Sequence, residues 1–237
     1  MKYMGSKNRI SKEIVGFINK YKAPNQLYYE PFVGGGNVID KLTGVRYGND
    51  INFYVIELLK ALQTGYDPPE NVSFEVWRDV KNNKENYPAW FVGFCGICLS
   101  FGAVWFCAYS RDSKSQRNFV AEARRNVLRQ APKLKDVIFT SEHYFDLEIP
   151  SGSFIYCDPP YKGTDKYRGF EKFNSDLFFN WCSEMSKNNF VLISEFEAPK
   201  DFICVWEKSI NTNMAEKILG KNITERLFVH SVNAYLL

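Results

Sequence analysis

The sequence has 237 residues, enough for one substantial domain or for a domain with a subdomain. Its content of 45% hydrophobic and 24% charged residues is ordinary for a globular protein, and the absence of internal repeats or low-complexity stretches excludes a repeat architecture. The formal net charge is only +3, so a basic surface would have to come from segregation of charges rather than from an excess of them.

The first third of the chain alternates between strand and helix patterns. Apolar residues at helical spacing predict a helix over 10–18, and a strand is expected over 27–32. The loop Gly34–Gly36 and a short helix over 37–42 follow, and a second strand over 46–50 ends in Asp50. A helix over 53–64 is stopped by Gly65. This order is typical of the opening of a doubly wound α/β fold.

The middle of the chain, 66–150, is less regular. Residues 89–108 carry no charge over about the length of a membrane span, but they contain three glycines and a single leucine. We therefore interpret them as a buried segment of glycine and aromatic residues, with a membrane-spanning helix as the alternative. Between 111 and 135, eight cations face only two acids, Asp112 and Glu122, which favours a phosphate-binding surface over a solvated helix face. The eight cations are Arg111, Lys114, Arg117, Arg124, Arg125, Arg129, Lys133 and Lys135.

Strand and helix patterns return after Gly152. We expect a buried strand over 153–157, a helix over 176–187 capped by Asn174 or Ser175, and strands over 190–194 and 202–206. A terminal strand or hairpin is expected over 226–236. The irregular middle is thus predicted to be inserted between two halves of one sheet.

The tetrapeptide Asp158-Pro159-Pro160-Tyr161 directly follows the predicted strand 153–157. Open α/β sheets bind ligands at the carboxyl ends of their strands, which makes this a candidate catalytic loop. A carboxylate and a rigid backbone carbonyl, here Asp158 and Pro159, can accept both N–H groups of a ring amine and localise its lone pair. Tyr161 offers a flat face on which an extruded base can stack. The alternative is a rigid turn capped by Asp158.

The glycine loop and Asp50 form a second candidate site. Glycines allow a ligand to approach the backbone closely, and an acid at the end of the next strand can accept both ribose hydroxyls. The dinucleotide fingerprint needs a further glycine three places after Gly36, where this chain has Ile39. The pattern therefore favours a nucleoside without a pyrophosphate, and S-adenosylmethionine is such a ligand.

Five segments together resemble the Dam-type N6-adenine DNA methyltransferases, especially the small phage-type members. Their order, with cofactor motifs before an insert and the catalytic motif after it, is that of the family's α group. The segments are Tyr3-Met-Gly-Ser-Lys7, Glu30 to Gly36, Tyr47 to Asn52, Asp158 to Tyr161 and Val191 to Glu195. The insert lacks a visible match to the part of the family that reads GATC.

The resemblance implies a Rossmann-like S-adenosylmethionine-dependent methyltransferase sheet from 1–65 and 151–237, with a DNA target-recognition region inserted over 66–150. It implies catalytic roles for Asp158, Pro159, Pro160 and Tyr161. From the residues alone, Lys7 would be a solvated lysine at a helix start. The cofactor-binding residues that we assign are Tyr3, Lys7, Glu30, Phe32, Gly34, Gly36, Asp50 and Asp158. The DNA-binding residues that we assign from the basic run are Arg111, Lys114, Arg117, Arg124 and Arg125.

The expected activity is site-specific methyl transfer to the N6 of an adenine flipped out of duplex DNA. Alternatives are N4 of cytosine, an adenine in RNA, a protein amide, or a catalytically inactive DNA-binding subunit of a modification complex. Asp at position 158 favours adenine in enzymes that resemble this one, and intact Asp50 and Tyr161 favour an active enzyme. We expect a cytoplasmic protein of a bacterial or phage-infected cell, as a monomer or weak dimer without membrane partners.

The cysteines and remaining aromatic residues are expected to be structural. No signal peptide precedes the six cysteines, so free thiols in a reducing compartment are expected. Cys95 and Cys98 have neither a second CxxC pair nor a nearby histidine, so no metal site is predicted. Phe170 and Phe173 either line a pocket or belong to the core, and both histidines, His143 and His230, are expected to be structural.

Overall fold

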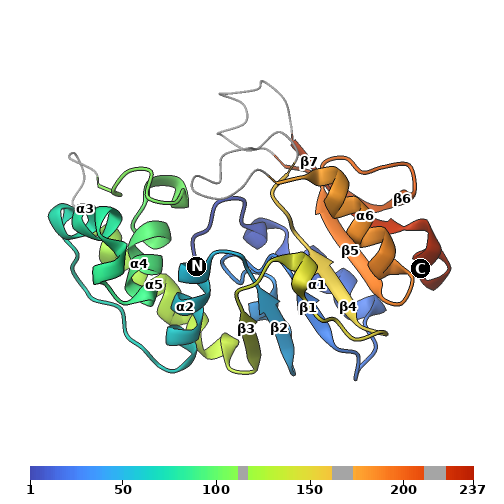
Figure 1. Ribbon diagram of the computed structural model, residues 1–237, viewed down its shortest axis with the longest axis horizontal. Helices are drawn as coiled ribbons and strands as arrows, with labels where there is room; N and C mark the ends of the chain where they lie inside the picture. The colour runs from blue at the N-terminus through green and yellow to red at the C-terminus, as the bar shows by residue number, and fades with distance from the viewer. Residues whose placement is uncertain (112–116, 162–172, 211–222) are drawn as a thin grey trace. The chain divides into compact units, whose positions relative to one another are not determined.

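The structure, a computed structural model, describes residues 1–111, 117–161, 173–210 and 223–237 (Figure 1). It divides into two compact units. Unit 1 comprises Met1–Lys20 and Phe32–Leu147, and unit 2 comprises Tyr21–Pro31 and Glu148–Leu237. The described residues contain seven strands and six α-helices, so the predicted α/β class is confirmed.

Unit 1 contains two parallel strands, β2 (Arg46–Asn49) and β3 (Val137–Thr140), with Arg46 opposite Val137. Because the strands are parallel, Asp50 and the loop that follows Thr140 leave them at the same edge. Strand β3 lies within 66–150, the range assigned above to the insert. The boundaries of that insert stay a prediction.

Five helices belong wholly or mainly to unit 1, and α3, α4 and α5 come from 66–150, the range with the less regular sequence pattern. Their bounds are α1 (Ser11–Tyr21), α2 (Phe53–Gln63), α3 (Phe74–Asn82), α4 (Ala89–Gly93) and α5 (Phe119–Gln130). The N-caps Asn52, Ser73 and Asn118 each accept a backbone N–H from the first turn, which explains where α2, α3 and α5 begin.

Residues 92–100 of the uncharged segment 89–108 are buried, as predicted, whereas residues 101–102 and 107–108 are exposed. Helix α4 continues into a π-helical turn, Phe94–Cys98, and then a 3-10 turn, Phe101–Ala103. A Cβ atom on Gly93 would lie 2.1 Å from the Tyr54 carbonyl oxygen, so only glycine lets α4 approach α2 this closely. Among the described residues, no helix combines the length and apolar character needed to cross a bilayer.

Unit 2 contains a five-stranded mixed sheet. Its order is β1 (Tyr28–Glu30), β4 (Phe154–Cys157), β5 (Phe190–Glu195), β7 (Ile223–His230) and β6 (Phe202–Ile210). Strands β1, β4 and β5 are parallel, whereas β7 runs antiparallel to both β5 and β6. Of the terminal strand or hairpin predicted over 226–236, only a strand is present, because β7 ends at His230 and a 3-10 turn, Ser231–Leu236, follows it. The antiparallel partner of β7 is β6, which comes earlier in the chain.

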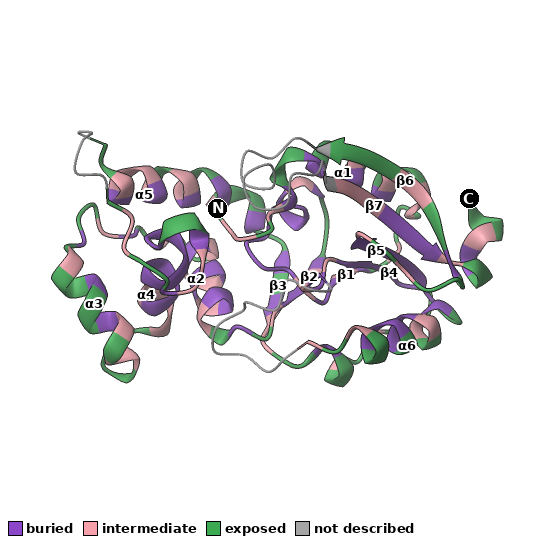
Figure 2. Cartoon of the chain, turned by 90° about the horizontal axis from the view of Figure 1, so that it is seen from above, coloured by how far each residue is buried: buried purple, intermediate pink, exposed green. Residues whose placement is uncertain are grey.

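Helix α6 (Ser175–Ser186) packs on β5, and the side chain of Asn174 caps it, as predicted. All residues of β4 and β5 are buried, and α6 turns Phe178 and Cys182 inward while its other side is exposed (Figure 2). The parallel strands therefore form a rigid, apolar support for the loops at their carboxyl ends.

Candidate active site

The glycine loop of unit 1 packs directly against Tyr3. Gly34 and Gly36 have φ values of +47° and +66°, which other residues rarely adopt. A Cβ on Gly34 would lie 2.7 Å from Tyr3 Cε1, and one on Gly35 would lie 2.7 Å from Tyr3 Cβ. The glycines are therefore needed for both conformation and space, and the structure brings the predicted Tyr3 and Gly34 together.

Asp50 closes the same loop. Its Oδ2 accepts the backbone N–H of Gly34 at 2.9 Å, and its Oδ1 accepts that of Asn52 at 2.9 Å. The Ser141 hydroxyl donates to the Asp50 carbonyl at 3.0 Å, which anchors the backbone at this point. Burial raises the pKa of Asp50 to about 6, although the hydrogen bonds from Asn52 and Gly34 lower it in part.

The loop after β3 adds an aromatic wall that the sequence analysis did not assign to the site. Asn49 Oδ1 accepts the backbone N–H of Glu142 at 2.9 Å, which ties this loop to the end of β2. Beyond it, Tyr144 packs against Phe32 with ring centroids 5.1 Å apart and against Phe145 at 4.4 Å. The sequence signal was the aromatic run that follows the strand pattern of 137–140.

Gln130, the last residue of α5, forms hydrogen bonds to the backbone of the glycine loop. Its buried side-chain amide donates to the carbonyl oxygens of Gly35 at 2.9 Å and Gly36 at 3.0 Å. No local motif marks Gln130 in the sequence, because its partners lie more than 90 residues away.

Lys7 is buried rather than solvated, which contradicts the interpretation from the residues alone. It lies in the 3-10 turn Lys7–Arg9 with a side chain that is only 7% exposed, and its Nζ donates to the carbonyl of Gly5 at 3.4 Å. The N-terminal segment therefore places Lys7 in the interior of unit 1 and a half-buried Tyr3 against the glycine loop.

In unit 2, the predicted catalytic loop directly follows β4. Asp158 and Pro160 are half-buried, whereas Pro159 and Tyr161 are buried. The Tyr161 hydroxyl donates to Glu225 Oε2 at 2.9 Å, and burial together with the charges of Asp158 and Glu225 raises the pKa of Tyr161 well above its usual value.

Two further hydrogen bonds join buried polar groups of β1, β4 and β5. The Tyr28 hydroxyl donates to Glu30 at 2.5 Å, and the hydroxyls of Tyr156 and Ser194 share a hydrogen bond of 2.8 Å. Burial and the neighbouring Glu30 raise the pKa of Tyr28. Glu30 and Asp158 thus occupy the carboxyl ends of β1 and β4, as the sequence predicted.

The basic residues of unit 1 differ in how strongly they are engaged. Arg124 forms ion pairs with Asp67 at 2.5 Å and Glu70 at 3.4 Å, and Arg117 pairs with Glu122 at 2.5 Å. The other assigned cations include Arg111, whose guanidinium lies 5.0 Å from the Phe74 ring centroid, and Arg125, which is exposed. Lys114 lies outside the described residues.

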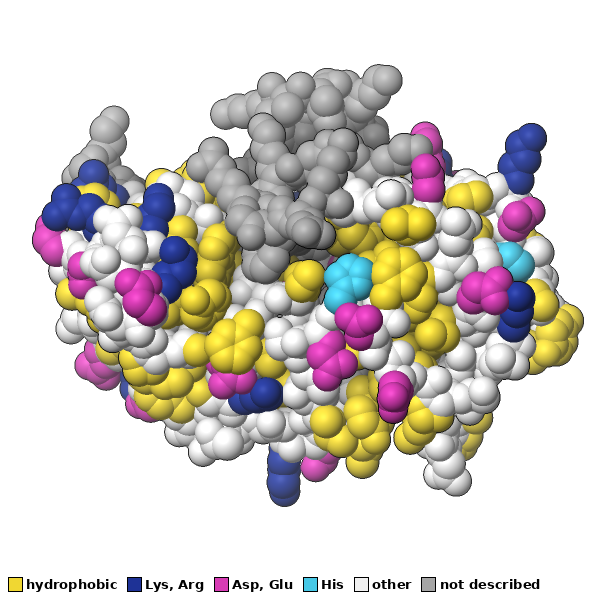
Figure 3. Space-filling model, viewed as in Figure 1, with side chains coloured by type: hydrophobic (Ala, Val, Ile, Leu, Met, Phe, Trp, Pro, Cys, Tyr) yellow, Lys and Arg dark blue, Asp and Glu magenta, His cyan; other side chains and the backbone are white. Residues whose placement is uncertain are grey.

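Figure 3 shows Lys and Arg side chains gathered over the α3 end of unit 1. The acidic partners of Arg124 belong to Asp67-Pro68-Pro69-Glu70, the second Asp-Pro-Pro sequence of the chain. The carboxylates of this segment form ion pairs with an arginine, whereas Asp158-Pro159-Pro160 follows a buried strand.

Of the two phenylalanines predicted to line a pocket or belong to the core, Phe173 packs against Phe178 with ring centroids 5.5 Å apart. Phe170 lies outside the described residues.

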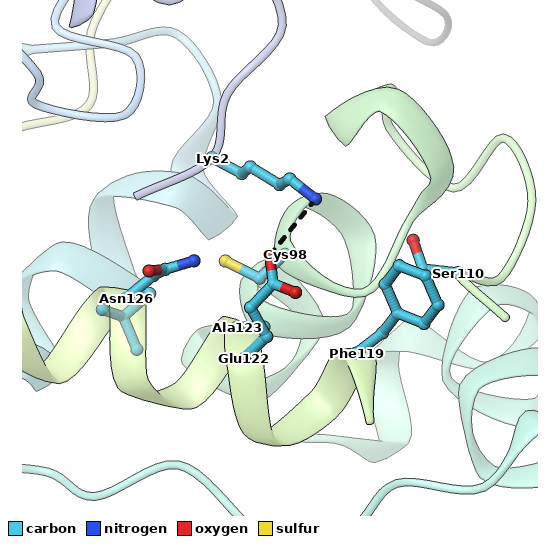
Figure 4. A pocket seen from close by; sticks show the side chains of 8 residues that line it. Lys2, Cys98, Ser110, Phe119, Glu122, Ala123 and Asn126 are labelled. Carbon is cyan, nitrogen blue, oxygen red and sulfur yellow. Dashed lines mark ion pairs between the residues drawn. The ribbon is translucent and has the colours of Figure 1, made fainter. Parts of the chain in front are cut away.

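A small pocket in unit 1 lies apart from the strand ends (Figure 4). It is lined by Lys2, Cys98, Ser110, Phe119, Glu122, Ala123, Asn126 and Val127, and the Lys2 to Glu122 ion pair of 3.9 Å crosses it. Burial raises the pKa of Cys98 to about 12, so its thiol is unreactive. Across the described ranges, no group of three or more His, Cys, Asp or Glu residues could hold a metal ion.

Comparison with known proteins identifies relatives of this chain. The modification methylase StsI of Streptococcus sanguinis is 25% identical over 223 residues, covering 81% of this chain and 32% of that protein. The chain thus spans about a third of the length of this curated relative. The rRNA methyltransferase aviRa of Streptomyces viridochromogenes gives a TM-score of 0.46 at 8% identity, over 99% of this chain and 88% of that one.

The sequence model of the family of D12 class N6 adenine-specific DNA methyltransferases matches residues 3–92 and 69–195 of this chain. These ranges include the glycine loop, Asp50 and the Asp158 loop. The resemblance inferred from the sequence is confirmed, and with it the methyltransferase fold class and S-adenosylmethionine as the family's methyl donor. The chain belongs to the D12 class N6 adenine-specific DNA methyltransferase family.

Proposed function

We propose that this chain transfers a methyl group to the N6 of an adenine that is flipped out of duplex DNA. The single observation that carries the proposal is the placement of Asp158-Pro159-Pro160-Tyr161 at the carboxyl end of buried β4, in a chain of the D12 family. The modification methylase among its relatives supports a role as the modification enzyme of a restriction-modification system.

The residues of unit 1 fit the nucleoside part of S-adenosylmethionine. The glycine loop leaves no room for a Cβ at Gly34, Asp50 offers lone pairs to ribose hydroxyls, and Phe32 with Tyr144 offers aromatic surface to an adenine ring. We assign Tyr3, Lys7 and Gly36 of unit 1 to the same binding function. For Glu30, which belongs to unit 2, the cofactor role stays the assignment made from the sequence. When bound, S-adenosylmethionine supplies an electrophilic methyl group on a sulfonium.

The residues of the Asp158 loop prepare the amine. Asp158 accepts one N–H of the target amine, and the Pro159 carbonyl accepts the other, which localises a lone pair that would otherwise be delocalised into the ring. Tyr161 stacks on the extruded base, and stacking worth about 1–3 kcal/mol offsets part of the cost of extrusion. The basic residues of unit 1 hold the DNA phosphates.

The test is to incubate the protein with S-adenosylmethionine and unmethylated DNA, digest the DNA to nucleosides and identify the product by mass spectrometry. We expect N6-methyladenine, and base-resolution mapping would then give the recognition sequence. N4-methylcytosine without N6-methyladenine would overturn the target assignment. Methylation of RNA or protein alone would support the other acceptors, and lack of cofactor binding by calorimetry would identify an inactive subunit.

A further inference from the structure

The amino-terminal end of β7 lies beside the catalytic loop. Strand β7 is antiparallel to β5, and their pairing reaches Glu195 opposite Arg226. Glu225 therefore lies one residue past this pair, at the edge where β4 and β5 end. From there its Oε2 accepts a hydrogen bond of 2.9 Å from the hydroxyl of Tyr161.

The ring of Tyr161 is held at a second point by Phe196. The two rings are edge-on, with centroids 4.5 Å apart and an interplanar angle of 87°. Phe196 is itself tethered, because its carbonyl accepts a hydrogen bond of 2.6 Å from Nη1 of Arg226. Adjacent residues of β7 thus hold both Tyr161 and the neighbour that packs against it.

We propose that Glu225 is a positioning residue that sets the ring plane of Tyr161 for stacking on the target base. The proposal rests on the proposed function, in which Tyr161 contacts the flipped adenine. Packing alone would be satisfied by phenylalanine, and the hydroxyl adds a directional bond at the far end of the ring. A carboxylate is a strong acceptor for such a bond, so the ring plane is defined at both its edge and its tip.

A double-mutant cycle tests this. Tyr161→Phe removes the donor, Glu225→Ala removes the acceptor, and the double variant removes both. We expect each single variant to lower the single-turnover rate of methyl transfer to unmethylated DNA by roughly tenfold, the least that a hydrogen bond to a charged group is typically worth. The double variant should be no slower than either single one, and affinity for S-adenosylmethionine should change less than about twofold.

Glu225→Gln should restore most of the rate, because its amide oxygen can still accept the bond. Glu197→Ala, which removes an exposed carboxylate from the same edge, is the matched control and should transfer methyl groups at the wild-type rate. Rate losses that multiply in the double variant, or a fast Glu225→Ala protein, would overturn the proposal.

Thermal unfolding of the wild type, the two single variants of the cycle and the double variant separates this proposal from the proposed function. Coupling between Tyr161 and Glu225 in the unfolding free energies reports their hydrogen bond even if the wild-type protein methylates no DNA. Absence of that coupling would overturn the positioning role directly. In a wild-type protein that methylates DNA, coupling in stability without coupling in rate would equally overturn it, since the bond would then be only structural.

Discussion

Asp50 is a carboxylate whose two oxygens each accept a backbone N–H before any ligand binds. Each oxygen keeps a second lone pair, so the residue can still accept two ribose hydroxyls. The same burial that positions these oxygens disfavours their charge and raises the pKa of Asp50 from 3.8 to about 6. Its protonation state is therefore sensitive to pH values close to neutrality.

We predict that cofactor affinity depends on pH through Asp50. Ribose hydroxyls donate to the ionised carboxylate, so affinity for S-adenosylmethionine should rise as the pH increases to about 6 and level off above it. Below the pKa the dissociation constant should increase by about tenfold per pH unit. Calorimetric titrations between pH 5 and 8 measure this. Asp50→Asn should bind more weakly without this pH dependence, whereas exposed Asp201→Asn should behave as wild type; a wild-type affinity that is constant over this range would contradict the prediction.

Stability should respond to the same group in the opposite direction. Because the folded-state pKa of Asp50 is raised, the folded protein holds a proton between pH 3.8 and about 6 that the unfolded chain has released. The contribution of Asp50 to the free energy of unfolding therefore falls as the pH rises through this window. Asp50→Asn should remove this dependence, which denaturant titrations at pH 4.5 and 6.5 would detect as a smaller difference between the two conditions.

Asp158 is predicted to be required for transfer but not for folding. It is half-buried and directly follows β4, and in the proposed mechanism it accepts one N–H of the target amine. Asp158→Ala should lower the transfer rate by about 100-fold or more, the loss typical of a preorganised electrostatic contributor. Single-turnover assays and circular dichroism measure rate and fold together, with Asp201→Ala as the matched surface control. A folded Asp158→Ala protein with near-native turnover would remove the residue from the mechanism.

At the scale of elements, helix α5 connects two features that are distant in sequence. Its exposed residues include Arg125 and Arg129, and its last residue, Gln130, is buried against the glycine loop. The helix thus carries the proposed phosphate contacts on one side and supports the glycine loop, the proposed cofactor-binding loop, at its end. Because Gly34 and Gly36 need unusual backbone angles, hydrogen bonds to the neighbouring carbonyls help to define the loop conformation.

Replacing Gln130 by leucine should therefore weaken binding of S-adenosylmethionine. Two buried carbonyls lose their donor, and we expect roughly tenfold lower affinity, corresponding to about 1–2 kcal/mol. Gln63 provides a matched control, since its amide also donates to backbone carbonyls, those of Leu134, Lys135 and Val137, and to none of the glycine loop. Gln130→Leu and Gln63→Leu should both lower the melting temperature, but only Gln130→Leu should change the affinity for S-adenosylmethionine that calorimetry measures. Equal affinities for the two variants would argue against a role for Gln130 in cofactor binding.

The elements differ in how far the sequence alone could predict them. Helix α2 and strands β4 and β5 have strong local patterns, and the Asp158 loop was placed correctly because it directly follows an apolar strand. Helix α5 was missed although local signals mark it, namely the N-cap Asn118 and buried residues at helical spacing. Strand β3 was missed because its short pattern depends on its partner β2, which lies far away in sequence. The same reason hid Gln130 and Glu225, whose roles come entirely from long-range hydrogen bonds.

At the scale of the whole molecule, a net charge of +3 conceals the uneven engagement of its cations. In the basic run, Arg117 and Arg124 are paired with carboxylates, so part of their charge is already balanced. Exposed arginines have a greater capacity to release counterions when DNA binds, since they need not first leave an acidic partner. Among the described cations of α5, Arg125 and Arg129 are exposed and one helical turn apart.

The salt dependence of DNA binding should therefore arise more from Arg125 and Arg129 than from Arg124. Each phosphate contact that is lost should flatten the slope of log affinity against log salt concentration by about 0.9, so the Arg125→Ala/Arg129→Ala double variant should lose up to about 1.8. Arg124→Ala should change the slope by less, and instead release Asp67 and Glu70. Fluorescence anisotropy with a fixed duplex between 50 and 200 mM salt measures all three proteins against wild type. An unchanged slope in the double variant would show that this side of α5 is a solvated helix face, and a larger change in Arg124→Ala would show that its ion pairs open when DNA binds.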